Sequence, residues 1–202
     1  MNIALVDYGA GNLTSVIKGL RAAGADVRVV STPDELSDAQ ALVIPGVGHF
    51  SATLALGEDW RGAVRDRLAA GVPFLGICLG MQWLFEGSDE APDAPGLGLL
   101  RGRCFRLPDT IKVPHVGWNT LAVSNTSSRL MAGLPEGAMA YFTHSFAAPT
   151  VDATAASTTH AVPFTSVVEL GRVFGTQFHP EKSGTTGLRL LANFLAAARE
   201  AR

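Results

Sequence analysis

The segment Gly76-Ile77-Cys78-Leu79-Gly80 constrains the fold most, because it places a cysteine between two glycines at a corner between two elements. The apolar residues 72–75 before it predict a buried parallel strand, and residues 81–86 after it predict the start of a helix. Glycines on both sides allow a turn too sharp for side chains, which is the form of a nucleophile elbow. The segment therefore predicts either a nucleophilic thiol at Cys78 or an inert cysteine of the core.

Backbone groups on two segments are candidates to stabilise an oxyanion beside this corner. The amide of Leu79 directly follows the cysteine, at the amino end of the expected helix, where a thiolate is also favoured. The loop 45–48, Pro-Gly-Val-Gly, ends the neighbouring predicted strand, at the edge where open α/β sheets place their sites. Its glycines would let a second amide turn toward Cys78, and a plain strand-to-helix turn is the alternative.

Strands and amphipathic helices alternate in the first 85 residues, which predicts a parallel sheet covered by helices on both faces. Apolar runs predict strands at residues 2–6, 26–30 and 41–44. Apolar residues at helical spacing predict helices that contain Leu13, Val16, Ile17 and Leu20, and then Trp60, Val64 and Leu68.

The pattern changes after residue 86. Residues 87–102 are rich in glycine, proline and acids and predict a loop, whereas residues 103–177 predict short extended pieces, with an exposed loop at 152–160. Apolar residues from 188 to 195 predict a C-terminal helix. The expected fold is α/β, with a mostly parallel central sheet in three layers and a smaller antiparallel extension, in a single domain over residues 1–202.

Composition excludes several classes of function. The 202 residues carry a net charge of −2, so no global basic signal points to nucleic acid or to an anionic membrane. The two cysteines, Cys78 and Cys104, form no disulfide framework, and Cys104 is expected in the core. A predicted strand starts at residue 2, so we expect no secretory segment and a cytoplasmic location. The turn Gly9-Ala10-Gly11 lacks the third glycine of a dinucleotide fingerprint, because Thr14 stands there.

A cysteine nucleophile needs a base, and His179 is the best placed of the five histidines. It ends an extended run and is followed by Pro180 and Glu181, so the carboxylate two residues on can reach the imidazole. A strand end with a solvated acid is the alternative. A metal site is the other use of Cys, His and Glu, but the chain has neither CxxC nor HExxH.

Two motifs about a hundred residues apart resemble the class I glutamine amidotransferases: Gly-Ile-Cys-Leu-Gly-Met-Gln at 76–82 and Gln-Phe-His-Pro-Glu-Lys-Ser at 177–183. Further stretches are similar, within that family, to the glutaminase subunits of imidazole glycerol phosphate synthases of histidine biosynthesis. These are residues 7–12, 45–50, 85–90 and 114–119. The resemblance covers nearly the whole chain, although the Ala/Thr-rich segment 147–163 matches no pattern.

The resemblance implies a role for each matching residue. Cys78 would form a glutamyl thioester with glutamine, His179 would act as base and then as acid, and Glu181 would orient the imidazole. The residues that would form the oxyanion hole are Gly46, Val47 and Leu79. Those that would bind glutamine are Gln82, Glu90, Ser145 and Phe146, with the carboxylate of Glu90 on the ammonium group. Those near a partner interface would be Asn12, Trp118 and Asn119.

The implied partner is a (β/α)8 cyclase subunit, in a heterodimer that passes ammonia without release to bulk water. No metal or organic cofactor is implied. Two other hypotheses stay open: a glutaminase that serves another acceptor, such as anthranilate, guanylate or pyridoxal phosphate synthesis, and a non-enzymatic α/β module whose cysteine senses redox state.

Overall fold

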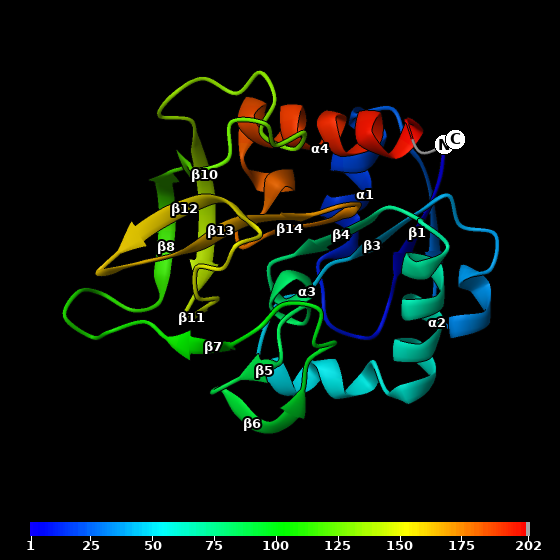
Figure 1. Ribbon diagram of the computed structural model, residues 1–202, viewed down its shortest axis with the longest axis horizontal. Helices are drawn as coiled ribbons and strands as arrows, with labels where there is room; N and C mark the ends of the chain where they lie inside the picture. Colours follow the sequence, from blue (N-terminus) through cyan, green and yellow to red (C-terminus); the bar gives the residue numbers. More distant parts are fainter. Residues whose placement is uncertain (201–202) are drawn as a thin grey trace.

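The computed structural model describes residues 1–200, and a sheet of eight strands runs through its centre (Figure 1). The strand order is β2-β1-β3-β4-β14-β13-β12-β9; neighbours are parallel from β2 to β14 and antiparallel from β14 to β9. The bounds are β1 Asn2–Val6, β2 Asp26–Val30, β3 Ala41–Ile44, β4 Phe74–Ile77, β9 Ala122–Val123, β12 Thr154–His160, β13 Val162–Leu170 and β14 Val173–Thr176. The expected three-layer α/β fold with an antiparallel extension is confirmed.

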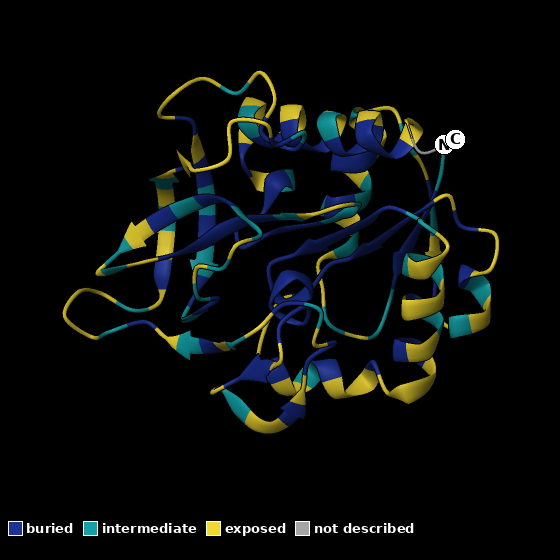
Figure 2. Cartoon of the chain, viewed as in Figure 1, coloured by how far each residue is buried: buried dark blue, intermediate teal, exposed yellow. Residues whose placement is uncertain are grey.

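Helices cover both faces of this sheet (Figure 1). Helices α1 (Leu13–Ala22) and α4 (Gly184–Arg199) lie on one face, and α2 (Glu58–Ala69) and the short α3 (Leu79–Gln82) lie on the other. Alternate residues of β1 therefore enter two separate cores, which explains why the strand is apolar almost without interruption. Figure 2 shows the result, a buried sheet between helices whose outer faces are exposed. Within residues 1–200, no helix combines the length and hydropathy needed to cross a bilayer.

Two smaller sheets complete the fold. One has the order β11-β7-β5-β6, and the other pairs β8 with β10 in antiparallel fashion. The bounds are β5 Gly87–Ser88, β6 Ala91–Pro95, β7 Arg103–Arg106, β8 His115–Thr120, β10 Met139–His144 and β11 Phe146–Ala147. The prediction of a loop at 87–102 was therefore wrong in part. Strand β6 contains two prolines and an aspartate, so its composition is typical of a loop although it pairs with β5.

The predicted loop at 152–160 is also corrected, because residues 154–160 form β12 between β13 and β9. Ala155, Ala156 and Thr158 are buried, but small and hydroxylated side chains gave the segment no hydrophobic alternation. The two elements that flank the elbow differ from the prediction in their bounds. The strand runs from Phe74 to Ile77, and the helix already ends at Gln82. The apolar residues after Gln82 fill the core without continuing the helix.

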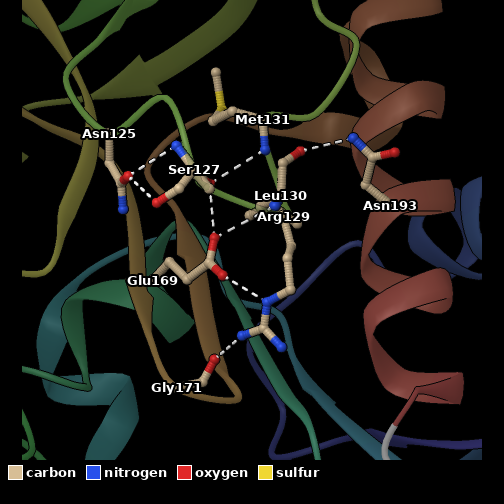
Figure 3. Close-up of polar contacts among 9 residues, drawn as sticks. Asn125, Ser127, Arg129, Leu130, Met131, Glu169, Gly171 and Asn193 are labelled. Carbon is tan, nitrogen blue, oxygen red and sulfur yellow. Dashed lines mark hydrogen bonds and ion pairs between the residues drawn. The ribbon is translucent and has the colours of Figure 1, made fainter.

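The segment between β9 and β10 is fixed by a cluster around Glu169 (Figure 3). The carboxylate of Glu169 accepts from Oγ of Ser128 at 2.6 Å and from Nε of Arg129 at 2.8 Å. Arg129 also donates to the carbonyl of Gly171 and lies 5.1 Å from the ring of Phe174. Glu169 thus ties this segment to the β13–β14 hairpin.

Candidate active site

Cys78 occupies the elbow between β4 and α3 in a backbone conformation that side chains rarely adopt, with φ +53° and ψ −107°. Its neighbours must be glycines, because backbone passes directly against them. A Cβ at Gly76 would lie 2.5 Å from the carbonyl oxygen of Gly80, and a Cβ at Gly80 would lie 1.8 Å from that of Ile44. The turn is strained and as sharp as the elbow expected from sequence.

Cys78 is 6% exposed and is held by Thr176, the last residue of β14, and by Gln177, which follows it. Its backbone N–H donates to the carbonyl of Thr176 at 2.6 Å. Its sulfur accepts from Nε2 of Gln177 at 3.7 Å. The helix that follows has only four residues, so its dipole supplies less stabilisation of a thiolate than the predicted longer helix would.

His179 and Glu181 form the hydrogen bond that the sequence predicted. Nδ1 of His179 is 2.9 Å from Oε1 of Glu181, and both side chains are almost completely buried. The contact arises in a 3-10 turn over Pro180–Lys182, whereas the sequence suggested an extended segment. Within the described chain, Nε2 of His179 is buried and has no hydrogen-bond partner.

Charge explains the unusual basicity of His179. Burial is the largest single influence and lowers its pKa, but the Cys78 thiolate and the Glu181 carboxylate together outweigh burial and raise the pKa to about 10. Folding raises this pKa from 6.5, so its contribution to stability is complete below pH 6.5 and is lost as the pH rises through 10. The site therefore favours the imidazolium form of His179.

A cavity of about 310 Å³ opens in front of Cys78. Its lining includes seven of the residues predicted from sequence: Val47, Cys78, Leu79, Gln82, Glu90, Ser145 and Phe146. The carboxylate of Glu90 accepts from the backbone N–H of Phe50 at 2.8 Å, which fixes one negative charge at the cavity wall. Gly46, His179 and Glu181 are not among the lining residues.

The loop after β3 is closed onto the elbow. The amide of Leu79 donates to the carbonyl of Gly46 at 3.4 Å. The same amide was expected to face an oxyanion, but here it is bonded to the loop. A Cβ at Gly46 would lie 2.3 Å from Oη of Tyr8. That buried hydroxyl has no hydrogen-bond partner in residues 1–200, and burial, with a smaller effect of the Cys78 charge, raises the pKa of Tyr8.

Several residues at this site were not assigned a role from sequence. His144, Thr143 and Pro114 line the cavity, and Gln177 contacts the sulfur. The only signal for Gln177 was its place two residues before His179 in a recognised motif. Nothing local marks His144, because its contacts depend on the pairing of β8 with β10.

The three predicted interface residues lie apart from the cavity lining. Asn12 is exposed and caps α1 by accepting from the amide of Ser15 at 3.3 Å. Trp118 is 52% exposed on β8. Asn119 is half-buried, and its side chain bonds inward to His115 and to the carbonyl of Thr159.

Within residues 1–200, no group of three or more His, Cys, Asp and Glu could hold a metal ion. Cys104 is fully buried in the second core, and burial raises the pKa of its thiol far above the usual range. Its environment agrees with the core role predicted for it.

The family model described as glutamine amidotransferase class-I matches residues 4–198. Relatives named imidazole glycerol phosphate synthase subunit HisH come from Halobacterium salinarum and Deinococcus radiodurans. The first is 48% identical over 203 residues, covering 96% of this chain and 92% of the relative, and the second is 48% identical over 199 residues, covering 95% and 92%.

A solved structure described as a glutamine amidotransferase superimposes with a TM-score of 0.76. The match covers 97% of this chain and 98% of the other at 23% sequence identity, so it bears on the fold alone.

Proposed function

Since the chain belongs to the glutamine amidotransferase class-I family, we propose that it is the glutaminase subunit of an imidazole glycerol phosphate synthase. Relatives at 48% identity carry that subunit's name and match nearly end to end, so the proposal takes residues 1–202 as one amidotransferase domain. The observation that carries the proposal is Cys78 at a strained elbow beside a buried, hydrogen-bonded His179–Glu181 pair.

Cys78 would supply the nucleophile and His179 the proton transfers. The sulfur attacks the side-chain carbonyl carbon of glutamine, a C–S bond forms, and the carbonyl oxygen takes the negative charge. His179 protonates the leaving nitrogen, the C–N bond breaks, and ammonia departs from the glutamyl thioester. Water then gives a proton to the same imidazole and attacks the thioester carbon. A C–O bond forms, the C–S bond breaks, and glutamate is released while the sulfur of Cys78 is regenerated. Glu181, bonded to Nδ1, would keep Nε2 directed at these steps.

The oxyanion would be stabilised by amides of Leu79 and of the Gly46–Val47 segment. The bond from Leu79 to the Gly46 carbonyl is long, at 3.4 Å, and therefore costs little to break. Rotation of the peptide between Gly46 and Val47 would release the Leu79 amide and turn that of Val47 toward the cavity. The resting state would then be slow, and closure of the hole would be the step that a partner or substrate promotes.

The cavity offers suitable groups for the rest of glutamine. The fixed carboxylate of Glu90 would bind the α-ammonium group. Gln82, Ser145 and Phe146 would hold the remaining backbone of the amino acid. The cavity volume of about 310 Å³ is sufficient for an amino acid of this size.

The partner would be a (β/α)8 cyclase subunit, docked near Asn12, Trp118 and Asn119. Val116 and Trp118, two residues apart on β8, are 55% and 52% exposed, so this strand presents apolar surface that a partner could cover. Ammonia would pass to the cyclase and react with a phosphoribulosyl-formimino ribonucleotide, giving imidazole glycerol phosphate and an aminoimidazole ribonucleotide.

Mixing the chain with a cyclase subunit and its nucleotide tests the proposal. We expect glutamate release to rise when both are present, and Cys78→Ala to abolish it while synthesis from added ammonia persists. Cys104→Ala is the matched control, because Cys104 is a buried thiol outside the cavity lining, and it should retain activity. Glutamine use by the Cys78→Ala complex would refute the nucleophile, and activation by a different synthase would refute the partner.

A further inference from the structure

A line of hydrogen bonds with fixed direction ends on the sulfur of Cys78, and the reaction steps above make no use of it. Gln177 is fully buried, and its Nε2 donates to the sulfur at 3.7 Å. Its Oε1 accepts from Nε2 of Gln82 at 3.1 Å. Because the oxygen end of the Gln177 amide is committed to Gln82, the NH2 end must face the sulfur.

Gln82 is oriented in the same manner. Its Nε2 also donates to the backbone carbonyl of Phe146 at 2.8 Å, so both N–H bonds are used. A carbonyl can only accept, so this contact fixes which end of the Gln82 amide points inward. The two amides therefore form a directed path from the cavity wall to the nucleophile.

His144 also bonds to the Phe146 carbonyl, and His115 bonds in turn to His144. Nδ1 of His144 lies 2.9 Å from that oxygen and must carry a proton, so its Nε2 accepts from Nδ1 of His115 at 3.1 Å. Nε2 of His115 in turn accepts from the amide of Asn119 at 3.2 Å. Burial lowers both pKa values, to about 3 for His144 and about 4 for His115, so each imidazole is neutral and has one donor and one acceptor.

We propose that Gln177 and His144 are positioning residues: Gln177 holds the Cys78 sulfur toward the cavity, and His144 holds the Phe146 carbonyl in the cavity wall. The inference rests on the proposed function, because the kcat and KM used to test it are those of glutamine hydrolysis. An N–H donor stabilises a thiolate more than a thiol or a thioester, so Gln177 acts on the nucleophile. His144 acts on the wall, and hence on the binding of glutamine.

The Gln177→Met substitution in the full-length chain tests the first role, because methionine has similar volume and no N–H. We expect alkylation of Cys78 by iodoacetamide near neutral pH to slow by about tenfold, and kcat to fall by about tenfold with KM unchanged. Cys104, a buried thiol with a raised pKa, is the unreactive internal reference. Ser166→Ala is the matched control: it removes a buried hydrogen bond to the Ala156 carbonyl and should leave both rates unchanged.

The pair His144→Phe and His144→Asn tests the second role. Phenylalanine keeps a ring but has no donor, so we expect KM for glutamine to rise by about tenfold with little change in kcat. Asparagine can place an N–H near the position of Nδ1 and should restore most of the affinity. A role in packing alone would change Tm, kcat and KM together, without rescue by asparagine.

Wild-type alkylation and kcat in Gln177→Met would overturn the role of Gln177, and wild-type KM in His144→Phe would overturn that of His144. If Gln177→Met does not fold, the side-chain amide resonance of Gln177 in the native protein decides: it should shift when Cys78 is alkylated, and an unchanged resonance refutes the contact. Alkylation needs no glutamine. A chain that alkylates as expected but releases no glutamate would refute the proposed function and leave the positioning role of Gln177 intact.

Discussion

Replacing Gly80 by alanine should damage the elbow more than any other single methyl group added to it. The new Cβ would lie 1.8 Å from the carbonyl oxygen of Ile44, whereas real Cβ atoms essentially never come within 3.0 Å. The backbones of β3 and the elbow must therefore separate by about 1.2 Å. Neither side of this contact is a flexible side chain, so the strain cannot be relieved by a rotamer change.

The cost follows from this geometry. Overpacking a core typically costs 1–3 kcal/mol, and a contact between two backbones belongs at or above the upper end, so we expect a loss of about 3 kcal/mol. For a chain of this size that corresponds to a fall in Tm of roughly 6–12 °C. A displacement of about 1 Å at Cys78 should lower the glutaminase rate by roughly a hundredfold in the variant that still folds.

Thermal unfolding and glutamate release in the presence of the partner measure the two effects. Gly62→Ala is the matched control, because Gly62 lies in the exposed part of α2 with no atom within 4 Å of the added Cβ. It should stabilise the protein by about 0.5–1 kcal/mol, since alanine favours a helix over glycine. A Gly80→Ala protein with the Tm and activity of the wild type would refute the close backbone contact and the reasoning built on it.

Three further changes test other parts of the structure. In Cys78→Ala the pKa of His179 should fall below about 10, because burial then opposes Glu181 alone. Imidazole titration by NMR measures this pKa, and an unchanged value would contradict the contribution of Cys78 to it. Tyr8→Phe should leave Tm unchanged or raise it by a few degrees, since the hydroxyl is buried without a partner, and a loss above about 1 kcal/mol would reveal one. Glu169→Ala should cost about 2–3 kcal/mol in denaturant unfolding with kcat unchanged, because it leaves Arg129 and a serine without their acceptor; a stability equal to wild type would show that the cluster is dispensable.

The parts of the fold that could be predicted from sequence are those with local signals. Strand β1 is a continuous apolar run, and α1 has apolar residues at helical spacing, so each was located from its own residues. Strand β12 has neither signal: it is built from alanine and threonine and is a strand because β13 and β9 pair with its two edges. Strand β6 likewise depends on pairing with β5. Tertiary pairing, which a short window of sequence does not contain, decided both.

The candidate site divides in the same way. Cys78 stands in a motif, and His179 and Glu181 are two residues apart, so their relation was predictable. The cavity wall was not, because His115 and His144 are 29 positions apart and meet only through the register of β8 with β10. The family resemblance implies that Asn119 lies near a partner, but the sequence does not show that the amide of this residue turns inward to His115.

Close backbone contacts fix both the elbow that carries Cys78 and the turn that follows His179. The elbow packs against β3 at Gly80. The turn that follows His179 packs against α4 at Gly187, where an added Cβ would lie 1.8 Å from the carbonyl oxygen of Pro180. Because both contacts join backbone to backbone, neither segment can shift without disturbing the packing beside it. Under the proposed function, the imidazole Nε2, which has no hydrogen-bond partner within residues 1–200, would be free to take and return the protons of thioester formation and hydrolysis.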